Sequence, residues 1–86
     1  MLTFKLDSEG KSLKISGESA SVNFSIKRHK IHSNIVEIFI DGGQESDRLI
    51  KIEYDNANVI SRIISGPASD KAIVQIGELV IKPTRD

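Results

Sequence analysis

Two apolar runs separated by a polar, glycine-containing loop constrain this chain more than any other feature. The runs are Ile35–Ile40 and Arg48–Tyr54, and both are rich in the β-branched and aromatic residues that favour strands. The loop between them, residues 41–47, contains Gly42 and Gly43, which adopt turn conformations readily. The stretch 35–54 therefore predicts a β-hairpin against which the rest of the chain has to pack.

The hairpin predicts a definite set of cross-strand pairs. With residues 41–47 as the loop, the pairs are Ile40–Arg48, Phe39–Leu49, Ile38–Ile50, Glu37–Lys51 and Val36–Ile52. Because side chains alternate between the faces of a sheet, one face is almost wholly apolar and carries Val36, Ile38, Ile50, Ile52 and Tyr54. Burial of this face excludes a shift of the pairing register by one residue. A shift by two residues remains an alternative, because the loop is long for a hairpin.

The opposite face of the hairpin is too apolar for an ordinary solvated surface. Beside the predicted Glu37–Lys51 pair it carries Ile35, Phe39 and Leu49. Either other strands of the chain cover these three residues, or they form a protein interface in an oligomer or with another partner. An exposed edge strand at residues 2–6 or 79–82 offers a second route to self-association, because unpaired edges accept further strands.

Short strand-like segments fill the rest of the chain. Residues 2–6, 13–15 and 22–26 alternate apolar with polar residues, and Gly77-Glu78 predicts a type II′ turn between two strands at 72–76 and 79–82. Residues 59–65 fit either a short helix, by their apolar stripe, or a strand, by their β-branched content, and we prefer the strand. The residues predicted to form the core are Phe24, Ile26, Ile38, Ile50 and Ile52.

Seven to eight short strands predict an all-β fold, a small antiparallel sandwich or barrel, with an α+β fold containing one short helix at 59–65 as the alternative. Eighty-six residues indicate a single domain, 1–86. Without cysteines no disulfide can support so small a core, which favours oligomerisation. No signal peptide and no membrane-spanning apolar run is evident, so we expect a cytoplasmic or virion-associated protein without membrane contact.

The segment between the third predicted strand and the hairpin is basic. It contains Lys27, Arg28, His29, Lys30 and His32, which suit contacts with phosphates. The chain as a whole has a net charge of +0 and few aromatic residues for base stacking, so nucleic-acid binding is the alternative function rather than the first. The simpler interpretation is that this basic segment is a solvated connection between strands.

Catalytic and metal-binding patterns are weak throughout the sequence. The pair His29 and His32 supplies two zinc ligands where three or four are needed, and Asp41, Glu45 and Asp47 do not follow the spacing of a calcium loop. The sequence has neither a Gly-x-Ser-x-Gly elbow nor a phosphate-binding loop. We therefore assign no catalytic residue, metal ligand or cofactor, and we expect that the protein is not an enzyme.

These patterns favour a non-enzymatic binding or structural module that acts through a protein–protein surface and self-associates. A phage or bacterial accessory protein fits such a small, cysteine-free, all-β chain. The predicted interface residues are Ile35, Phe39 and Leu49.

Overall fold

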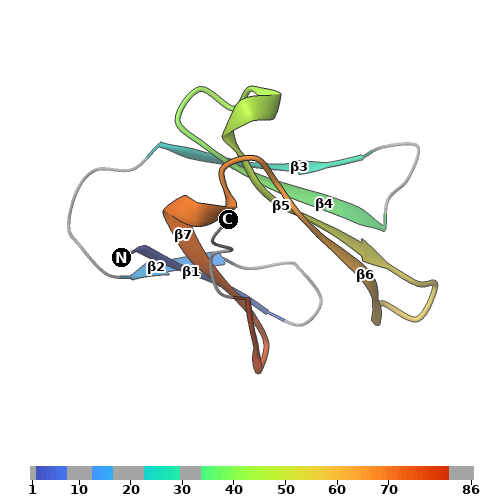
Figure 1. Ribbon diagram of the computed structural model, residues 1–86. Coiled ribbons are helices and arrows are strands. Elements are labelled where there is room, and N and C mark those ends of the chain that lie inside the picture. Colours follow the sequence, from blue (N-terminus) through green and yellow to red (C-terminus); the bar gives the residue numbers. More distant parts are fainter. Residues whose placement is uncertain (1, 8–12, 17–22, 30–33, 82–86) are drawn as a thin grey trace.

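Two β-sheets face each other in the computed structural model of the chain (Figure 1). The structure describes residues 2–7, 13–16, 23–29 and 34–81, and this part contains eight strands and two three-residue 3-10 helices. The strands of the first sheet are β1 (Leu2–Leu6), β2 (Leu13–Ser16), β7 (Ala72–Ile76) and β8 (Leu79–Ile81). Those of the second sheet are β3 (Phe24–Arg28), β4 (Ile35–Ile40), β5 (Arg48–Tyr54) and β6 (Ile60–Ser65). The 3-10 helices are η1 (Glu45–Asp47) and η2 (Ser69–Lys71). The all-β prediction is thus confirmed.

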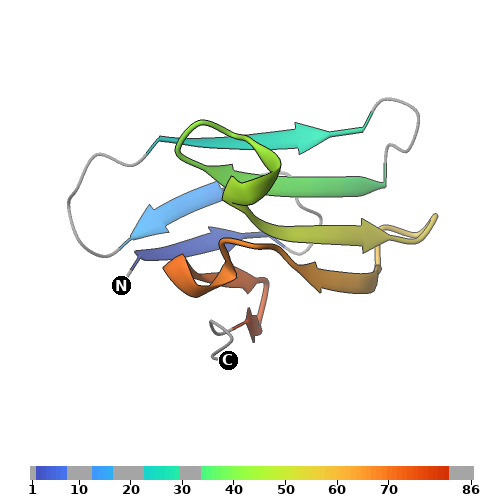
Figure 2. The same cartoon turned by 45° about the horizontal axis from the view of Figure 1, so that its top comes forward.

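The second sheet is an antiparallel meander, with β3, β4, β5 and β6 side by side in sequence order (Figure 2). The first sheet has the order β2-β1-β7-β8 and is not wholly antiparallel, because β1 and β7 run parallel. The chain makes the β1–β2 pair, builds the whole second sheet, and then returns to place β7 against β1. Strand β1 therefore has a neighbour on each side, and the expectation that residues 2–6 form an exposed edge is wrong.

The core lies between the sheets and is made by the inward faces of β1, β4, β5 and β7. Three of the five predicted core residues, Ile38, Ile50 and Ile52, are confirmed as fully buried. The other two are corrected: Ile26 is half-buried, and Phe24 is 44% exposed although its ring meets Phe4 edge-on at a centroid distance of 6.0 Å. Both lie on β3, an edge strand of its sheet.

A β-bulge interrupts the pairing of β4 with β5. The predicted pairs Val36–Ile52, Glu37–Lys51 and Ile38–Ile50 are all present, but Phe39 is then paired with Arg48 instead of Leu49. Leu49 is the extra residue of the bulge, and its side chain joins the hydrophobic core. The predicted pairs Phe39–Leu49 and Ile40–Arg48 are therefore wrong.

The C-terminal half follows the sequence patterns closely. Residues 60–65 form a strand paired with β5, so the preferred interpretation of the ambiguous segment is confirmed. Ile76 pairs with Leu79 across a two-residue turn, and Gly77 has φ +56° while Glu78 is not among the described residues with positive φ, as a type II′ turn requires. Among the described residues, no helix is long and apolar enough to cross a membrane.

Gly66 lies where the chain leaves β6 and passes close to β5. Its amide donates to the Leu49 carbonyl at 2.9 Å, and a Cβ added here would lie 2.1 Å from the Arg48 carbonyl oxygen. That oxygen belongs to the backbone of a paired strand, so it cannot move aside alone. Only glycine therefore fits at this position without displacing the backbone of Arg48.

We expect Gly66→Ala to destabilise the fold by about 1–3 kcal/mol or more, the usual cost of overpacking. Gly42→Ala is the matched control, because its new Cβ would meet nothing closer than the Asp47 carboxylate at 3.6 Å, an ordinary contact. Urea denaturation of both variants measures the free energy of unfolding. Equal stability of Gly66→Ala and Gly42→Ala would contradict the close approach of β5 to the end of β6.

Candidate functional site

The predicted interface residues lie in three different environments. Ile35 is half-buried at the start of β4, whereas Phe39 is 3% and Leu49 is 2% exposed. Leu49 belongs to the core because of the bulge, and the Lys27 ammonium lies over the Phe39 ring, 4.9 Å from its centroid. Phe39 and Leu49 are therefore covered within the chain itself, which is the first of the two explanations that the sequence left open. Whether the outer face of this sheet contacts a partner stays a prediction.

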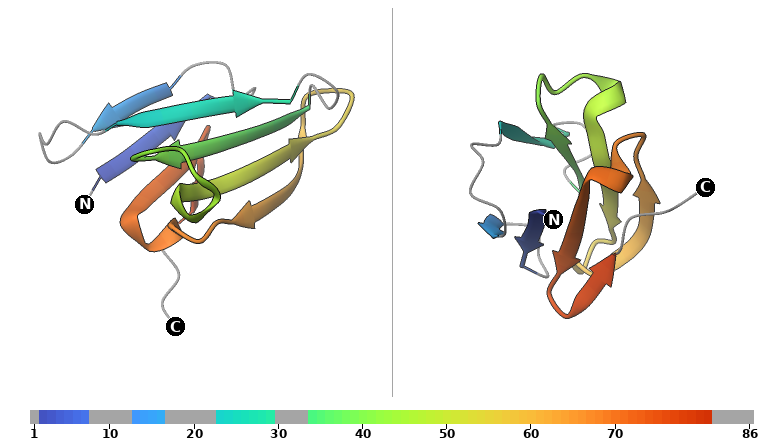
Figure 3. Two further views of the ribbon diagram at one scale, coloured as in Figure 1. Left: turned by 90° about the horizontal axis from the view of Figure 1, so that it is seen from above. Right: turned by 60° about the vertical axis from the view of Figure 1, so that its left-hand side comes forward.

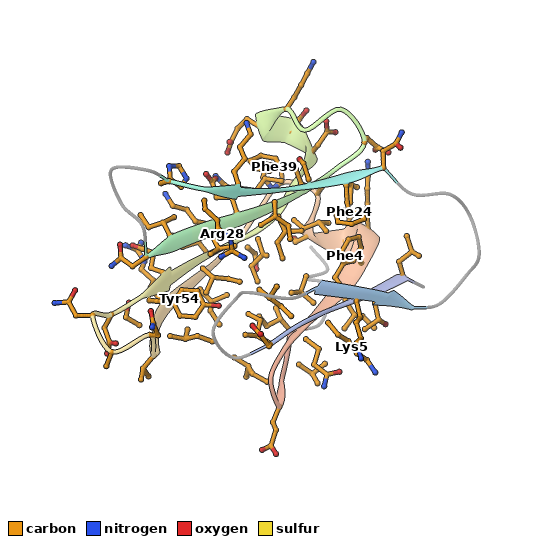
Figure 4. All side chains as sticks on the ribbon, turned by 180° about the vertical axis from the view of Figure 1, so that it is seen from behind. Phe4, Lys5, Phe24, Arg28, Phe39 and Tyr54 are labelled. Atoms are coloured by element: carbon orange, nitrogen blue, oxygen red, sulfur yellow. The ribbon has the colours of Figure 1, made fainter. Side chains whose placement is uncertain are left out.

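The basic segment is split between the two faces of β3. Lys27 and Arg28 are adjacent in the strand and so point to opposite sides of it. Figure 4 shows Phe39 on the outer side of the second sheet, and Arg28 and Tyr54 on the side that faces the first sheet. Lys30 and His32 lie outside the described residues. Lys27 and Arg28 thus do not share one surface, and nucleic-acid binding stays a prediction.

Arg28 is close enough to Tyr54 for its charge to act on the phenol. Burial raises the pKa of Tyr54, the carboxylate of Asp7 raises it further, and the guanidinium of Arg28 lowers it. Both charged residues are themselves exposed. This end of the sandwich therefore combines a buried phenol with two exposed charged side chains.

A cluster of charged side chains surrounds Glu37 on the outer face of the second sheet. We call it the Glu37 cluster, and it consists of Glu37, His29, Arg48 and Glu45. Glu37 is only 7% exposed, and its Oε1 is hydrogen-bonded to His29 Nε2. Arg48 Nη1 donates to Glu37 Oε2 at 3.4 Å and is paired with Glu45 Oε1 at 2.7 Å. Both oxygens of the buried carboxylate therefore have a basic partner.

Local backbone structure positions each member of the Glu37 cluster. The His29 amide donates to the Ile35 carbonyl at 3.3 Å, which extends the β3–β4 ladder by one residue and holds the imidazole beside β4. The bulge turns Arg48 to the outer face, opposite Phe39, and η1 carries Glu45 within reach of it. The sequence predicted Glu37 beside Lys51, which is correct for the backbone, but gave no signal for the contacts with His29 and Arg48. These contacts depend on the bulge and on where β3 ends.

The electrostatics of Glu37 favour its ionised form. Burial raises the pKa of Glu37, but the hydrogen bonds and positive charges of His29 and Arg48 outweigh it and hold the pKa below its usual range. Through His29 and Arg48, the Glu37 carboxylate thus links the end of β3 and the η1 loop to the outer face of the second sheet. Among the described residues, no group of three or more His, Asp or Glu side chains could hold a metal ion.

The edge of the first sheet presents a different kind of surface. We call it the β8 edge, and it consists of Leu79, Val80 and Ile81. Among the described strands β8 pairs with β7 alone, and its side chains Leu79 and Val80 are each 47% exposed. The other three edge strands of the described chain each contain a basic residue: Lys14 in β2, Lys27 and Arg28 in β3, and Arg62 in β6. Charges on an edge discourage further strand pairing, and the three residues of β8 carry none, although Glu78 precedes the strand and Lys82 follows it in the sequence.

The turn geometry determines which backbone groups of the β8 edge are unpaired. In a hairpin with a two-residue loop, the residues that flank the loop form a hydrogen-bonded pair, and pairs then alternate. Ile76–Leu79 and Val74–Ile81 are therefore the hydrogen-bonded pairs, and Gln75–Val80 lies between them. It follows that the N–H and C=O of Val80 point away from β7. The sequence located this edge at residues 79–82, but only the β8 register shows which residue offers its backbone.

Glu37→Gln should remove part of the acid sensitivity of folding. Because the pKa of Glu37 is lowered in the folded chain, its stabilising contribution is present above the unfolded pKa and is lost as pH falls through the folded pKa. We expect Glu37→Gln to be less stable than wild type at about pH 5, and the difference to shrink towards about pH 2. Urea denaturation at each pH measures the free energy of unfolding.

Glu78→Gln is the control, because it removes one carboxylate from the exposed turn before β8. It should leave the pH dependence close to that of wild type. A stability difference for Glu37→Gln that does not change with pH would contradict the lowered pKa.

No family model, curated protein or solved structure matches this chain. Within the described part of the chain, the Glu37 cluster and the β8 edge are the candidate binding surfaces.

Proposed function

We propose that this chain is a non-enzymatic protein-binding module that accepts a further strand at the β8 edge, and that it self-associates in this way. The observation that supports the proposal is an edge strand with no charged residue, with apolar side chains exposed on both of its faces. Leu79 lies on the same side of the sheet as Ile81, towards the core, while Val80 lies on the outer side. A paired strand would cover both faces at once.

The Glu37 cluster is the weaker candidate for a binding surface. Its carboxylate already has partners at both oxygens, and Arg48 is engaged with two carboxylates. A ligand would have to replace contacts that are already made in a largely buried position. By contrast, pairing at the β8 edge breaks no hydrogen bond between β8 and the other described strands, because the Val80 backbone groups point away from β7.

The size of the β8 edge sets the expected affinity. Burying the exposed halves of Leu79 and Val80 is worth about 1 kcal/mol for each side chain, given about 1.5–3 kcal/mol for complete burial. Each new backbone hydrogen bond adds about 0.5–1.5 kcal/mol. Association has an entropic cost of about 4–15 kcal/mol, which is at least comparable with these gains together. We therefore propose a weak, concentration-dependent complex.

Val80→Pro tests the proposal because it deletes the outward N–H without removing a hydrogen bond to β7. Proline is tolerated on edge strands where the N–H faces solvent. Val80→Thr is the matched control, since it keeps both the N–H and the β-branched shape. We expect the wild type and Val80→Thr to gain mass with concentration in light scattering, and Val80→Pro to keep the mass of one chain with an unchanged circular dichroism spectrum.

Two results would overturn the proposal. One is a wild-type chain that keeps the mass of a single chain up to millimolar concentration. The other is a Val80→Pro variant that associates as strongly as the wild type, since this would locate the contact elsewhere.

A further inference from the structure

We infer that the partner at the β8 edge is the β8 edge of a second copy, paired antiparallel about a two-fold axis at Val80. The two four-stranded first sheets would then form one continuous eight-stranded sheet. This inference rests on the proposed function and adds to it the strand of the second copy that is paired, the register and the closed dimeric state.

The hydrogen-bonding groups of β8 determine the register. Within β8, Leu79 and Ile81 direct their backbone groups to β7, and Val80 alone directs its N–H and C=O outward. An antiparallel partner strand meets Val80 with one donor and one acceptor of a single residue, whereas a parallel strand would use groups of two different residues. Val80 of a second copy offers this pair of groups, and antiparallel pairing of the two residues makes two reciprocal hydrogen bonds.

The side chains agree with this register. When Val80 faces Val80, each Leu79 faces Ile81 of the second copy, so all three positions join apolar residues. Leu79 and Ile81 lie on the core side, where Ile81 already packs against the core cluster. Figure 3 shows β8 at the margin of its sheet, where the partly exposed Leu79 would gain a neighbour from the second copy.

As a partner for β8, the β8 strand of a second copy fits better than the edge strands β2, β3 and β6. Pairing β8 with β2, β3 or β6 would bring Lys14, Lys27 or Arg62 to an apolar strand. Such a head-to-tail contact would also leave one β8 free and generate a filament, whereas two-fold pairing uses the same patch twice and closes. The net charge of +0 means that two copies do not repel each other through overall charge.

Cysteine crosslinking tests the register, because the chain contains no cysteine of its own. In the proposed dimer Leu79 and Ile81 of the second copy form a non-hydrogen-bonded pair with Cα atoms about 4.5 Å apart, within the range that a disulfide spans. Leu79 faces Leu79 of the second copy only diagonally, at about 7–8 Å. Leu79→Cys should therefore form disulfides with Ile81→Cys and not with itself.

The two variants are mixed in equal amounts, one of them labelled with nitrogen-15, oxidised slowly, and analysed by mass spectrometry without reduction. Random pairing gives mixed dimers in about half of the product, a fraction that the same mixture in denaturant measures directly. We expect mixed dimers well above this fraction in the folded mixture. A random distribution would overturn the register.

A second variant keeps the test valid if Ile81→Cys, which changes a half-buried residue, fails to fold. Val80→Cys lies at the two-fold axis with Cα atoms about 5.5 Å apart, so it should crosslink to itself at least tenfold faster than Val59→Cys. Val59 is the control for random collision because it is 59% exposed in the turn before β6. Equal rates would overturn the inference.

The failure of this inference is distinguishable from failure of the proposed function. If association persists and is abolished by Val80→Pro, but crosslinking is random or light scattering shows masses beyond two chains, the edge binds in another register and the two-fold dimer is wrong. If the wild type does not associate at all, the proposed function fails together with the inference.

Discussion

The antiparallel pairing of β4 with β5 is the contact on which the rest of this structure depends. It aligns Val36 and Ile38 with Ile52 and Ile50, and these four side chains are the centre of the core. Large-to-small changes in such fully buried positions cost about 2–5 kcal/mol, a large share of the stability of so small a domain. The strands β3 and β6 extend this pair on either side, and the first sheet covers its apolar face.

The bulge in the same pair organises the outer face. By adding Leu49 to the core it brings Arg48 to the outer side, where the guanidinium neutralises Glu37 and contacts Glu45. A buried carboxylate is costly unless it is paired, so without the bulge Glu37 would depend on His29 and on its backbone neighbour Lys51. The bulge at Leu49 thus stabilises the Glu37 cluster on the outer face of the second sheet. From its apolar residues alone, this face resembled a protein interface.

Alternation along the strands was enough to predict the elements and most of the hairpin register, because burial of one face leaves little freedom. It could not predict the pair Phe39–Arg48, since a bulge breaks the period of two that the prediction assumes. Nor could it predict the parallel pairing of β1 with β7, which joins segments from the two ends of the chain. Phe24 was misplaced because a strand pattern shows which residues share a face, not how completely the opposite sheet covers them.

The β8 edge illustrates what the structure adds to a correct sequence prediction. Residues 79–82 and the Gly77-Glu78 turn were recognisable, but the contrast with the charged edges of β2, β3 and β6 required the strand order. In that order β7 lies beside β1, and the whole second sheet, with the β4–β5 pair at its centre, stands between these two strands in the sequence.

Backbone nuclear Overhauser effects between β4 and β5 test this account most directly. The bulged β4–β5 register predicts cross-strand contacts of Ile38 with Ile50 and of Phe39 with Arg48, with the amide of Leu49 outside the regular ladder. A regular series in which Phe39 contacts Leu49 and Ile40 contacts Arg48 would contradict it, because Leu49 would then lie on the outer face and Arg48 would face the core.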